Sequence, residues 1–326
     1  MTRNEFTFLS ADGRTQLHAV EWIPAGPVRA ALQISHGLGE HVLRYDEFAE
    51  YLTAHGVAAF GHDHLGHGTS VPPDGVRLWY GPKGSWNWLI EDLYALRRLS
   101  ETRLAIKSGT PVFLLGHSMG SFAARSYLIR YPGTVDGAVL SGTGQPPAAL
   151  IAFGQALIAE ESARLGETSV SLLASALAFG SYNRPFAPNR TMYDWMSANE
   201  ENVDIFLSSP LCGGAPTIGL IREMLSGLRE IGSPSELRRM NRNTPILFLS
   251  GDADPVGDMG KGVRKVERAF RKAGMRDVNM ALYPGMRHEI LNERDRRAVY
   301  NDIFRWMESR MGTPASPFSY FNPHNN

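Results

Sequence analysis

The chain has 326 residues, and its 33 basic residues balance its 33 acidic residues. This length suits one large domain with an insertion better than a single small core. The zero net charge provides no overall field to recruit nucleic acid or an anionic membrane, so we expect no nucleic-acid partner. A single cysteine, Cys212, excludes an internal disulfide framework and a cysteine-rich zinc site.

Targeting signals are the next class to exclude. The amino-terminal residues carry no apolar run of the kind found in secretory signals. No stretch of the sequence has the roughly 18 consecutive apolar residues that a helix needs to span a bilayer. We therefore expect a cytoplasmic protein, and the sequence makes no prediction of its oligomeric state.

The predicted elements follow an α/β pattern in chain order. Residues 5–24 predict a hairpin closed by Asp12-Gly13, which would form an antiparallel edge of a sheet. Short apolar runs then predict buried strands at 30–35, 56–61, 111–116, 136–141, 244–250 and 278–283. Helical spacing appears at 43–55, 86–106, 121–131 and 262–273. This alternation predicts a mostly parallel, eight-stranded sheet flanked by helices.

One long interval breaks the alternation. From about Gly144 to Asn243 only helical stretches are recognisable, at 146–165 and 217–231, and this is too long for an ordinary crossover. We predict a helical cap inserted between two strands of one sheet. The expected division is a core of 1–144 and 244–312, a cap of 145–243 and a loop-like tail of 313–326.

The sequence Gly-His-Ser-Met-Gly at 116–120 joins a predicted strand to a predicted helix. This arrangement is typical of a nucleophile elbow, in which a tight turn exposes the serine hydroxyl. Gly116 and Gly120 would leave room for the strand and helix to approach each other. The hydroxyl of Ser118 would then project at the carboxyl edge of the sheet, where open α/β folds bind ligands.

A serine nucleophile of this kind needs an acid and then a histidine later in the chain. His288 follows the last predicted strand, whereas His324 lies in the tail, so His288 is the candidate general base. Asp252 and Asp254 both follow the strand at 244–250. Spacing alone does not separate these two aspartates, because either one could merely shape the loop.

Five motifs resemble those of the monoacylglycerol lipase and lysophospholipase group of serine hydrolases, within the α/β-hydrolase superfamily. They are HGLGEHVLRY, GHDHLGHGTS, GHSMGS, SGDADPVG and YPGMRHE, and they occur in the order found in that group. The resemblance covers residues 29–70, 110–145 and 244–293. The segment 194–214 is also similar to caps of bacterial members.

The resemblance implies an α/β-hydrolase fold with an inserted cap and a triad of Ser118, Asp254 and His288, with Asp252 as a loop residue. The implied reaction cleaves a lipid ester of the monoacylglycerol or lysophospholipid type through an acyl-enzyme. Two alternatives remain, a serine aminopeptidase of related fold and a carboxylesterase acting on a non-lipid metabolite. An aminopeptidase would need cap carboxylates to hold a free amine, and the candidates are Glu160, Glu161, Glu200, Glu201 and Asp204.

The fold also implies an oxyanion hole made of the backbone N–H groups of Leu38 and Met119. Glu40 and Arg44 match positions that lie near the alcohol side of the site in the resembled lipases. The alternative is a solvated ion pair one helical turn apart. Mammalian members carry a second histidine where this chain has Leu291, so the recognition of glycerol is an open question.

Two further patterns have competing explanations. His62, His64 and His67 suggest a metal site, but the aspartate is misplaced for the known metallo-hydrolase motif, so we expect neither a metal nor a cofactor. The stretches 147–159 and 171–179 are strongly apolar. They would either pack as core or make transient contact with a lipid interface, which would associate the protein peripherally with a membrane.

Overall fold

We describe the fold from a computed structural model, in which residues 1–72, 75–104, 106 and 109–311 are described. The predicted tail, 313–326, lies outside these residues. The central feature is an eight-stranded sheet with the order β1-β2-β4-β3-β5-β6-β7-β8. Its strands are Thr2–Leu9, Gln16–Ile23, Ala30–Ser35, Val57–His62, Val112–His117, Gly137–Ser141, Ile246–Gly251 and Val278–Tyr283, numbered β1 to β8 in chain order.

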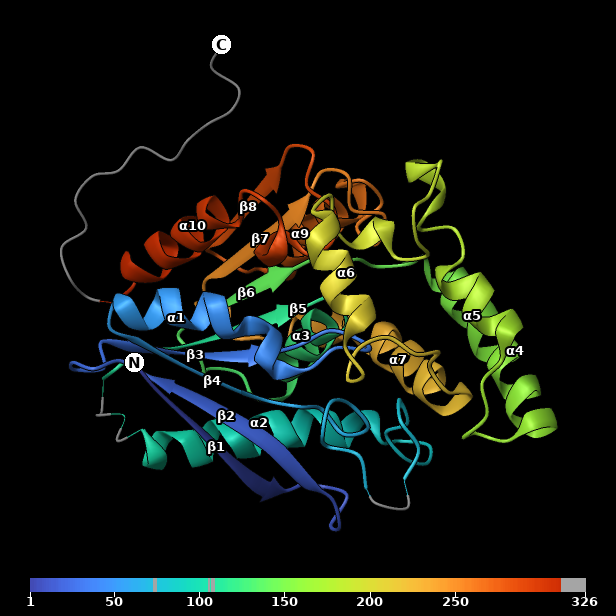
Figure 1. The fold of residues 1–326 in the computed structure, drawn as a ribbon, viewed down its shortest axis with the longest axis horizontal. Coiled ribbons are helices and arrows are strands. Elements are labelled where there is room, and N and C mark those ends of the chain that lie inside the picture. The colour runs from blue at the N-terminus through green and yellow to red at the C-terminus, as the bar shows by residue number, and fades with distance from the viewer. Residues whose placement is uncertain (73–74, 105, 107–108, 312–326) are drawn as a thin grey trace.

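The strands divide into an antiparallel edge and a parallel body. β1 and β2 form the predicted hairpin, with Leu9 opposite Gln16, and β2 pairs antiparallel with β4. All pairings from β4 through β3 to β8 are parallel. The arrowheads of the parallel strands point to one side of the molecule (Figure 1). The predicted mostly parallel, eight-stranded fold is confirmed.

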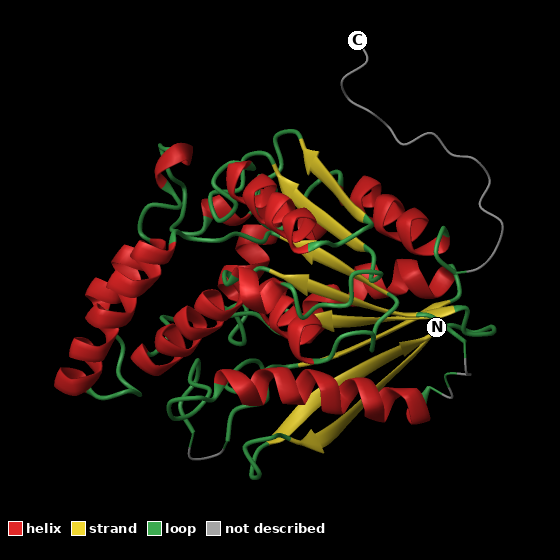
Figure 2. Cartoon of the chain, turned by 180° about the vertical axis from the view of Figure 1, so that it is seen from behind, coloured by secondary structure: helices red, strands yellow, loops and turns green. Residues whose placement is uncertain are grey.

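Helices cover both faces of the sheet (Figures 1 and 2). One face packs against α1, Asp46–Ala54, and α10, Arg296–Glu308, with the short η1, Val42–Tyr45, before α1. The other face packs against α2, Trp86–Arg103, α3, Met119–Arg130, and α9, Lys261–Ala273. Successive residues of β5 point to opposite faces of the sheet. Phe113 packs in the core beside α1 and α10, and Leu114 packs in the core beside α2, α3 and α9.

The chain between β6 and β7 is helical, and these two strands are neighbours in the sheet. This helical insertion, which we call the cap, comprises α4, α5, η2, η3, α6, α7 and α8, with bounds Ala148–Leu165, Leu172–Phe179, Arg184–Phe186, Asp194–Met196, Glu200–Ser208, Ile218–Ile231 and Pro234–Leu237. Leu220, Met224 and Leu228 of α7 join the core against α2 and α3. α7 therefore fastens the insertion to the sheet layer.

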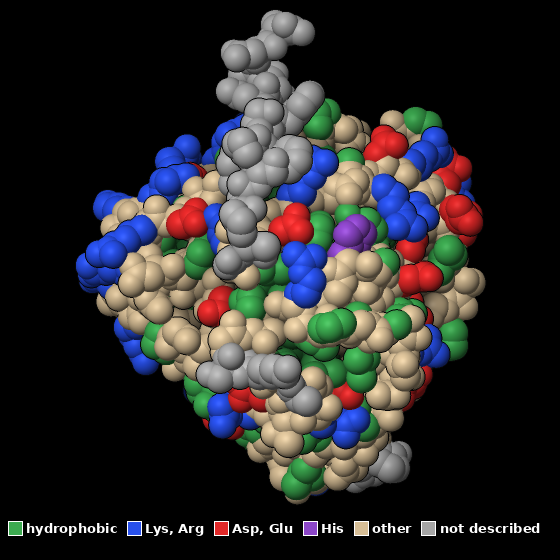
Figure 3. Space-filling model, turned by 90° about the vertical axis from the view of Figure 1, so that its left-hand side faces the viewer, with side chains coloured by type: hydrophobic (Ala, Val, Ile, Leu, Met, Phe, Trp, Pro, Cys, Tyr) green, Lys and Arg blue, Asp and Glu red, His purple; other side chains and the backbone are tan. Residues whose placement is uncertain are grey.

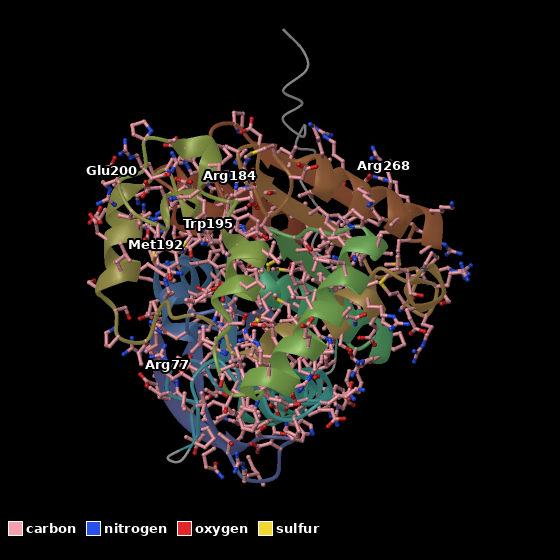
Figure 4. All side chains as sticks on the ribbon, turned by 90° about the vertical axis from the view of Figure 1, so that its right-hand side faces the viewer. Arg77, Arg184, Met192, Trp195, Glu200 and Arg268 are labelled. Atoms are coloured by element: carbon pink, nitrogen blue, oxygen red, sulfur yellow. The ribbon has the colours of Figure 1, made fainter. Side chains whose placement is uncertain are left out.

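Most of the apolar surface of α4 and α5 faces outward. Ile151 and Ile158 are buried on the inner side of α4, towards α7. In contrast, Phe153 is 60% exposed and Leu172 is 82% exposed, and the other exposed side chains on these helices include Leu150, Leu173 and Leu177. The interpretation of these stretches as core is therefore wrong for the outer side chains. Figure 4 looks onto this side, with α4 and α5 in front.

The opposite side of the molecule is different in character. There, hydrophobic side chains are interspersed with charged and polar ones (Figure 3). Among the helices that the structure describes, none combines the length and the hydropathy required to cross a bilayer.

Candidate active site

The predicted site residues gather at the carboxyl edge of the parallel strands. The segment 36–39, which we call the oxyanion loop, follows β3, and Ser118 follows β5. Asp254 follows β7, and the segment 284–289, which we call the base loop, follows β8 and carries His288. Carboxyl ends of parallel strands meet at one edge of a sheet, so residues far apart in the chain become neighbours.

Ser118 occupies a strained turn between β5 and α3. Its φ and ψ are 53° and −123°, a region that non-glycine residues rarely adopt. A side chain at Gly116 would collide with the backbone of Gly120, and one at Gly120 would collide with the carbonyl of Ser35. Glycine at both positions therefore allows the close approach that raises the serine above the strand, as an elbow requires.

His288 and Asp254 form a buried pair. Nδ1 of His288 lies 3.0 Å from Oδ2 of Asp254, and these residues are 3% and 0% exposed. Burial opposes the ionisation of both groups, but their mutual attraction outweighs it, so the pKa of Asp254 is lowered and the pKa of His288 is raised. Asp252 is exposed and accepts a hydrogen bond from the N–H of Gly285. The two aspartates that spacing left equivalent thus have different environments.

The ring of His288 lies between a core residue and a cap residue. Its centroid is 4.7 Å from that of His117, which immediately precedes Ser118, and 5.1 Å from that of Trp195 in η3. In the described chain, no hydrogen bond joins the His288 ring to the Ser118 hydroxyl. Unliganded sites commonly leave this contact longer until the substrate binds.

The oxyanion loop approaches the serine closely. A side chain added at Gly37 would lie 3.1 Å from Cβ of Ser118. Among the described residues, the backbone N–H groups of Leu38 and Met119 donate to no protein acceptor. Two unpaired amides near the serine could stabilise an oxygen that becomes negatively charged.

Glu40 and Arg44 do not form a solvated pair. Their side chains are 4% and 7% exposed, and Nη1 of Arg44 lies 2.9 Å from Oε2 of Glu40. The guanidinium also donates two hydrogen bonds, both 2.7 Å long, to the carboxylate of Glu289, and one of 3.0 Å to Asn202. The interpretation of Glu40 and Arg44 as a solvated ion pair is therefore wrong. Leu291, at the position of the second histidine of mammalian members, is buried in the core beside α10.

The clustered histidines are buried and bonded within the protein. Nε2 of His64 lies 3.1 Å from the Ser35 hydroxyl, and His36 accepts the backbone N–H of His64. Burial lowers the pKa of His62 and of His67 to about 3, so both are neutral. Within the described ranges, no group of three or more His, Cys, Asp or Glu side chains is arranged to hold a metal ion.

Comparison with known proteins shows the family to which the chain belongs. The model of the serine aminopeptidase S33 family matches residues 26–295. The chain belongs to the serine aminopeptidase S33 family. A monoacylglycerol lipase of Mycolicibacterium smegmatis is 27% identical, over 95% of this chain and 99% of the relative. A human monoglyceride lipase is 30% identical, over 95% of this chain and 92% of the relative.

The solved structures agree with the sequence relatives. A thermostable carboxyl esterase from Bacillus coagulans, in complex with glycerol, superposes with a TM-score of 0.87. The esterase is 27% identical to this protein, and the superposition covers 95% of this chain and 99% of the esterase chain. The chain is therefore an α/β-hydrolase similar to lipases and esterases, and an ester hydrolase.

Three residues at the site were not predicted from the sequence. Glu289 directly follows His288, so its adjacency was the one available signal. Asn202 and Trp195 lie in the cap segment 194–214, whose resemblance to other caps did not indicate which side chains face the site. Contacts between segments this distant in the chain depend on the packing of the cap on the core.

Proposed function

We propose that the protein hydrolyses lipid esters of the monoacylglycerol or lysophospholipid type through an acyl-enzyme on Ser118. The observation that carries this proposal is the buried 3.0 Å contact between His288 and Asp254 at the sheet edge where Ser118 forms a strained elbow. Relatives named as monoacylglycerol and monoglyceride lipases support the lipid substrate class.

The mechanism follows from the donors and acceptors in place. Asp254 accepts the Nδ1–H of His288, which leaves Nε2 free to take the proton of Ser118 as its oxygen attacks the ester carbonyl. The N–H groups of Leu38 and Met119 stabilise the oxyanion. His288 returns the proton to the departing alcohol, and an acyl-enzyme remains. A water molecule, deprotonated by the same imidazole, then releases the carboxylic acid and the free serine.

Replacement of the nucleophile tests the mechanism. Ser118→Ala should lower turnover of p-nitrophenyl esters by about 10⁶-fold, because no acyl-enzyme forms. Leu38→Ala should matter far less, since the donor is a backbone amide. A fluorophosphonate probe should label the wild type on Ser118, as checked by mass spectrometry of the tryptic peptide. Labelling elsewhere, or full activity of Ser118→Ala, would contradict the proposal.

The aminopeptidase alternative has weaker support. Four of the five candidate cap carboxylates, Glu160, Glu200, Glu201 and Asp204, are exposed at the surface. The fifth, Glu161, is paired with Arg164 and Ser171. Amino-acid p-nitroanilides and p-nitrophenyl esters should therefore be compared directly, and hydrolysis of the anilides at the higher kcat/KM would favour the peptidase. Equal rates for water-soluble and acylglycerol esters would instead favour a metabolite carboxylesterase.

We further propose that α4 and α5 contact a lipid interface. Exposed leucines on neighbouring helices are costly to hydrate and are typical of surfaces that meet lipid or another apolar partner. Leu172→Ser combined with Phe153→Ser should weaken sedimentation with phosphatidylcholine vesicles and slow hydrolysis of emulsified monoacylglycerol, while leaving hydrolysis of soluble p-nitrophenyl acetate unchanged. Leu9→Ser, at a 52% exposed position on β1, is the matched control. Unchanged vesicle binding of the double variant would rule out this contact.

A further inference from the structure

Arg44 connects three separate parts of the candidate site. Its two terminal nitrogens bind both carboxylate oxygens of Glu289 in the base loop, Glu40 beside the oxyanion loop, and the side-chain oxygen of Asn202 on α6. The guanidinium also lies over the ring of Phe206, 5.1 Å from its centroid. The sequence separation between Arg44 and Glu289 is 245 residues.

The network combines one guanidinium with two carboxylates, and all three side chains are shielded from solvent. Burial would raise the pKa of Glu289, but Arg44 lowers it to about 2, and the pKa of Glu40 is also lowered. Both carboxylates are therefore ionised at neutral pH, and their side chains are only 6% and 4% exposed. All four terminal N–H groups of Arg44 are donated within this network, so an alcohol hydroxyl could bind them only by displacing a charge-assisted hydrogen bond, which is stronger than a neutral one.

The two carboxylate partners of Arg44 are each next to a group that we propose acts in the reaction, by a hydrogen bond or by adjacency in the chain. Oε1 of Glu40 accepts the N–H of Gly37, which precedes Leu38, and also the hydroxyl of Tyr45 at 3.0 Å. Glu289 follows His288 in the chain. Asn202, on α6, donates a 2.7 Å hydrogen bond to Oε2 of Glu289, so α6 of the cap is bonded to the same carboxylate as Arg44.

We propose that Arg44 is a positioning residue that holds the oxyanion loop, the base loop and α6 of the cap in one arrangement, and that it does not bind the alcohol of the substrate. This inference rests on the proposed acyl-enzyme function. The planar guanidinium suits this role, because its fixed geometry sets the orientation of two carboxylates at once.

Alcohol binding and positioning, the two possible roles of Arg44, make different predictions for deacylation, the half of the reaction in which water hydrolyses the acyl-enzyme. An alcohol-binding residue acts only until the alcohol departs. A positioning residue acts in both halves, because the oxyanion hole and His288 serve acylation and deacylation alike. The rate at which water releases a group from Ser118 therefore distinguishes them.

The test uses three variants. Arg44→Lys keeps the positive charge but loses the planar pair of terminal nitrogens, and Glu289→Gln keeps the side-chain shape but loses the negative charge. Asn202→Ala removes the hydrogen bonds between α6 and the Arg44–Glu289 pair. Each purified full-length variant is carbamoylated with p-nitrophenyl dimethylcarbamate, and the recovery of esterase activity is followed after removal of the reagent. Acylation is measured with butyrate esters of methanol, glycerol and p-nitrophenol. We expect carbamoylation, recovery and all three acylation rates to fall together, by about tenfold for Arg44→Lys.

Arg103→Lys is the matched control, because Arg103 also binds both oxygens of a buried glutamate, Glu21, but far from the site. This control should retain wild-type rates. A loss confined to the glycerol ester, or wild-type recovery in all three variants, would overturn the inference. If Arg44→Lys fails to fold by circular dichroism, the other two variants decide the question. Failure of the proposed function has a separate signature, since the wild type would then carry no carbamoyl group on Ser118.

Discussion

The indole ring of Trp195 lies against the imidazole ring of His288, with 5.1 Å between their centroids and 41° between their planes. Trp195 belongs to η3 of the cap, whereas His288 follows β8 in the core. The residue after Trp195, Met196, accepts a 2.7 Å hydrogen bond from the backbone N–H of Glu289. The cap therefore contacts the proposed general base directly and helps to set its orientation.

Truncation of Trp195 should impair the reaction. Trp195→Ala removes one of the two rings that flank His288, and the resulting freedom of the imidazole should lower kcat for p-nitrophenyl butyrate by about tenfold. Trp195→Phe should recover most of this loss. Met192→Ala, at a 72% exposed position on the same side of the molecule (Figure 4), is the control and should behave as the wild type. An unchanged kcat in Trp195→Ala would show that the contact does not matter.

The pH profile should report the environment of His288. The base acts when neutral, so kcat/KM should fall as the pH drops through the pKa of His288, which Asp254 and the nearby glutamates raise above its ordinary value of 6.5. Glu289→Gln removes a negative charge that favours the imidazolium, so its acid limb should move to lower pH. Asp254→Asn should reduce kcat by about 10⁴-fold. A limb that stays in place in Glu289→Gln contradicts this electrostatic account.

The elbow should tolerate no side chain at Gly120. Gly120→Ala would drive a methyl group into the backbone carbonyls of Ser35 and His36, so we expect a loss of about 3 kcal/mol in the free energy of unfolding. Urea denaturation followed by tryptophan fluorescence measures this difference. Gly26→Ala is the control, because an added Cβ there has no neighbour within 4 Å and should be nearly neutral.

Arg125 should matter for the attachment of the cap. This buried side chain of α3 donates to the carbonyl of Gly144 at 2.8 Å and to that of Ile231 at 3.1 Å, at the two ends of the α4–α7 segment. Burial lowers its pKa to about 9, so it stays charged at neutral pH. Arg125→Met would leave these carbonyls unpaired and should cost about 3 kcal/mol in unfolding free energy. Equal stability of the variant and the wild type would refute this role.

Local features of the site were accessible from the sequence. The strand predicted at 30–35 matches β3, because an apolar run without alternation suits a strand covered on both faces. The elbow around Ser118 was predictable because the glycines that allow it lie within two positions of the serine. The chain order of Ser118, an aspartate after the strand at 244–250 and His288 suggested that they meet, since parallel strands end at one edge, and the family resemblance implied Asp254 as the aspartate.

Other features were decided by the tertiary structure. Spacing left Asp252 and Asp254 equivalent, whereas the fold buries only Asp254 beside His288. Hydropathy marked α4 and α5 as apolar but did not indicate that Leu172 and Phe153 would face outward.

The sequence by itself determined the strands, the elbow and the chain order of the proposed catalytic residues, because neighbouring residues encode these through backbone geometry and local hydrophobic pattern. Only the tertiary structure decided that Arg44 meets Glu289 and Asn202, and that Trp195 covers His288. These contacts join segments up to 245 residues apart. The contact of Arg44 with Glu289 arises because the segments after β3 and β8 meet at the sheet edge, and the contacts of Asn202 and Trp195 arise from the packing of the cap against that edge. No local pattern specifies either arrangement.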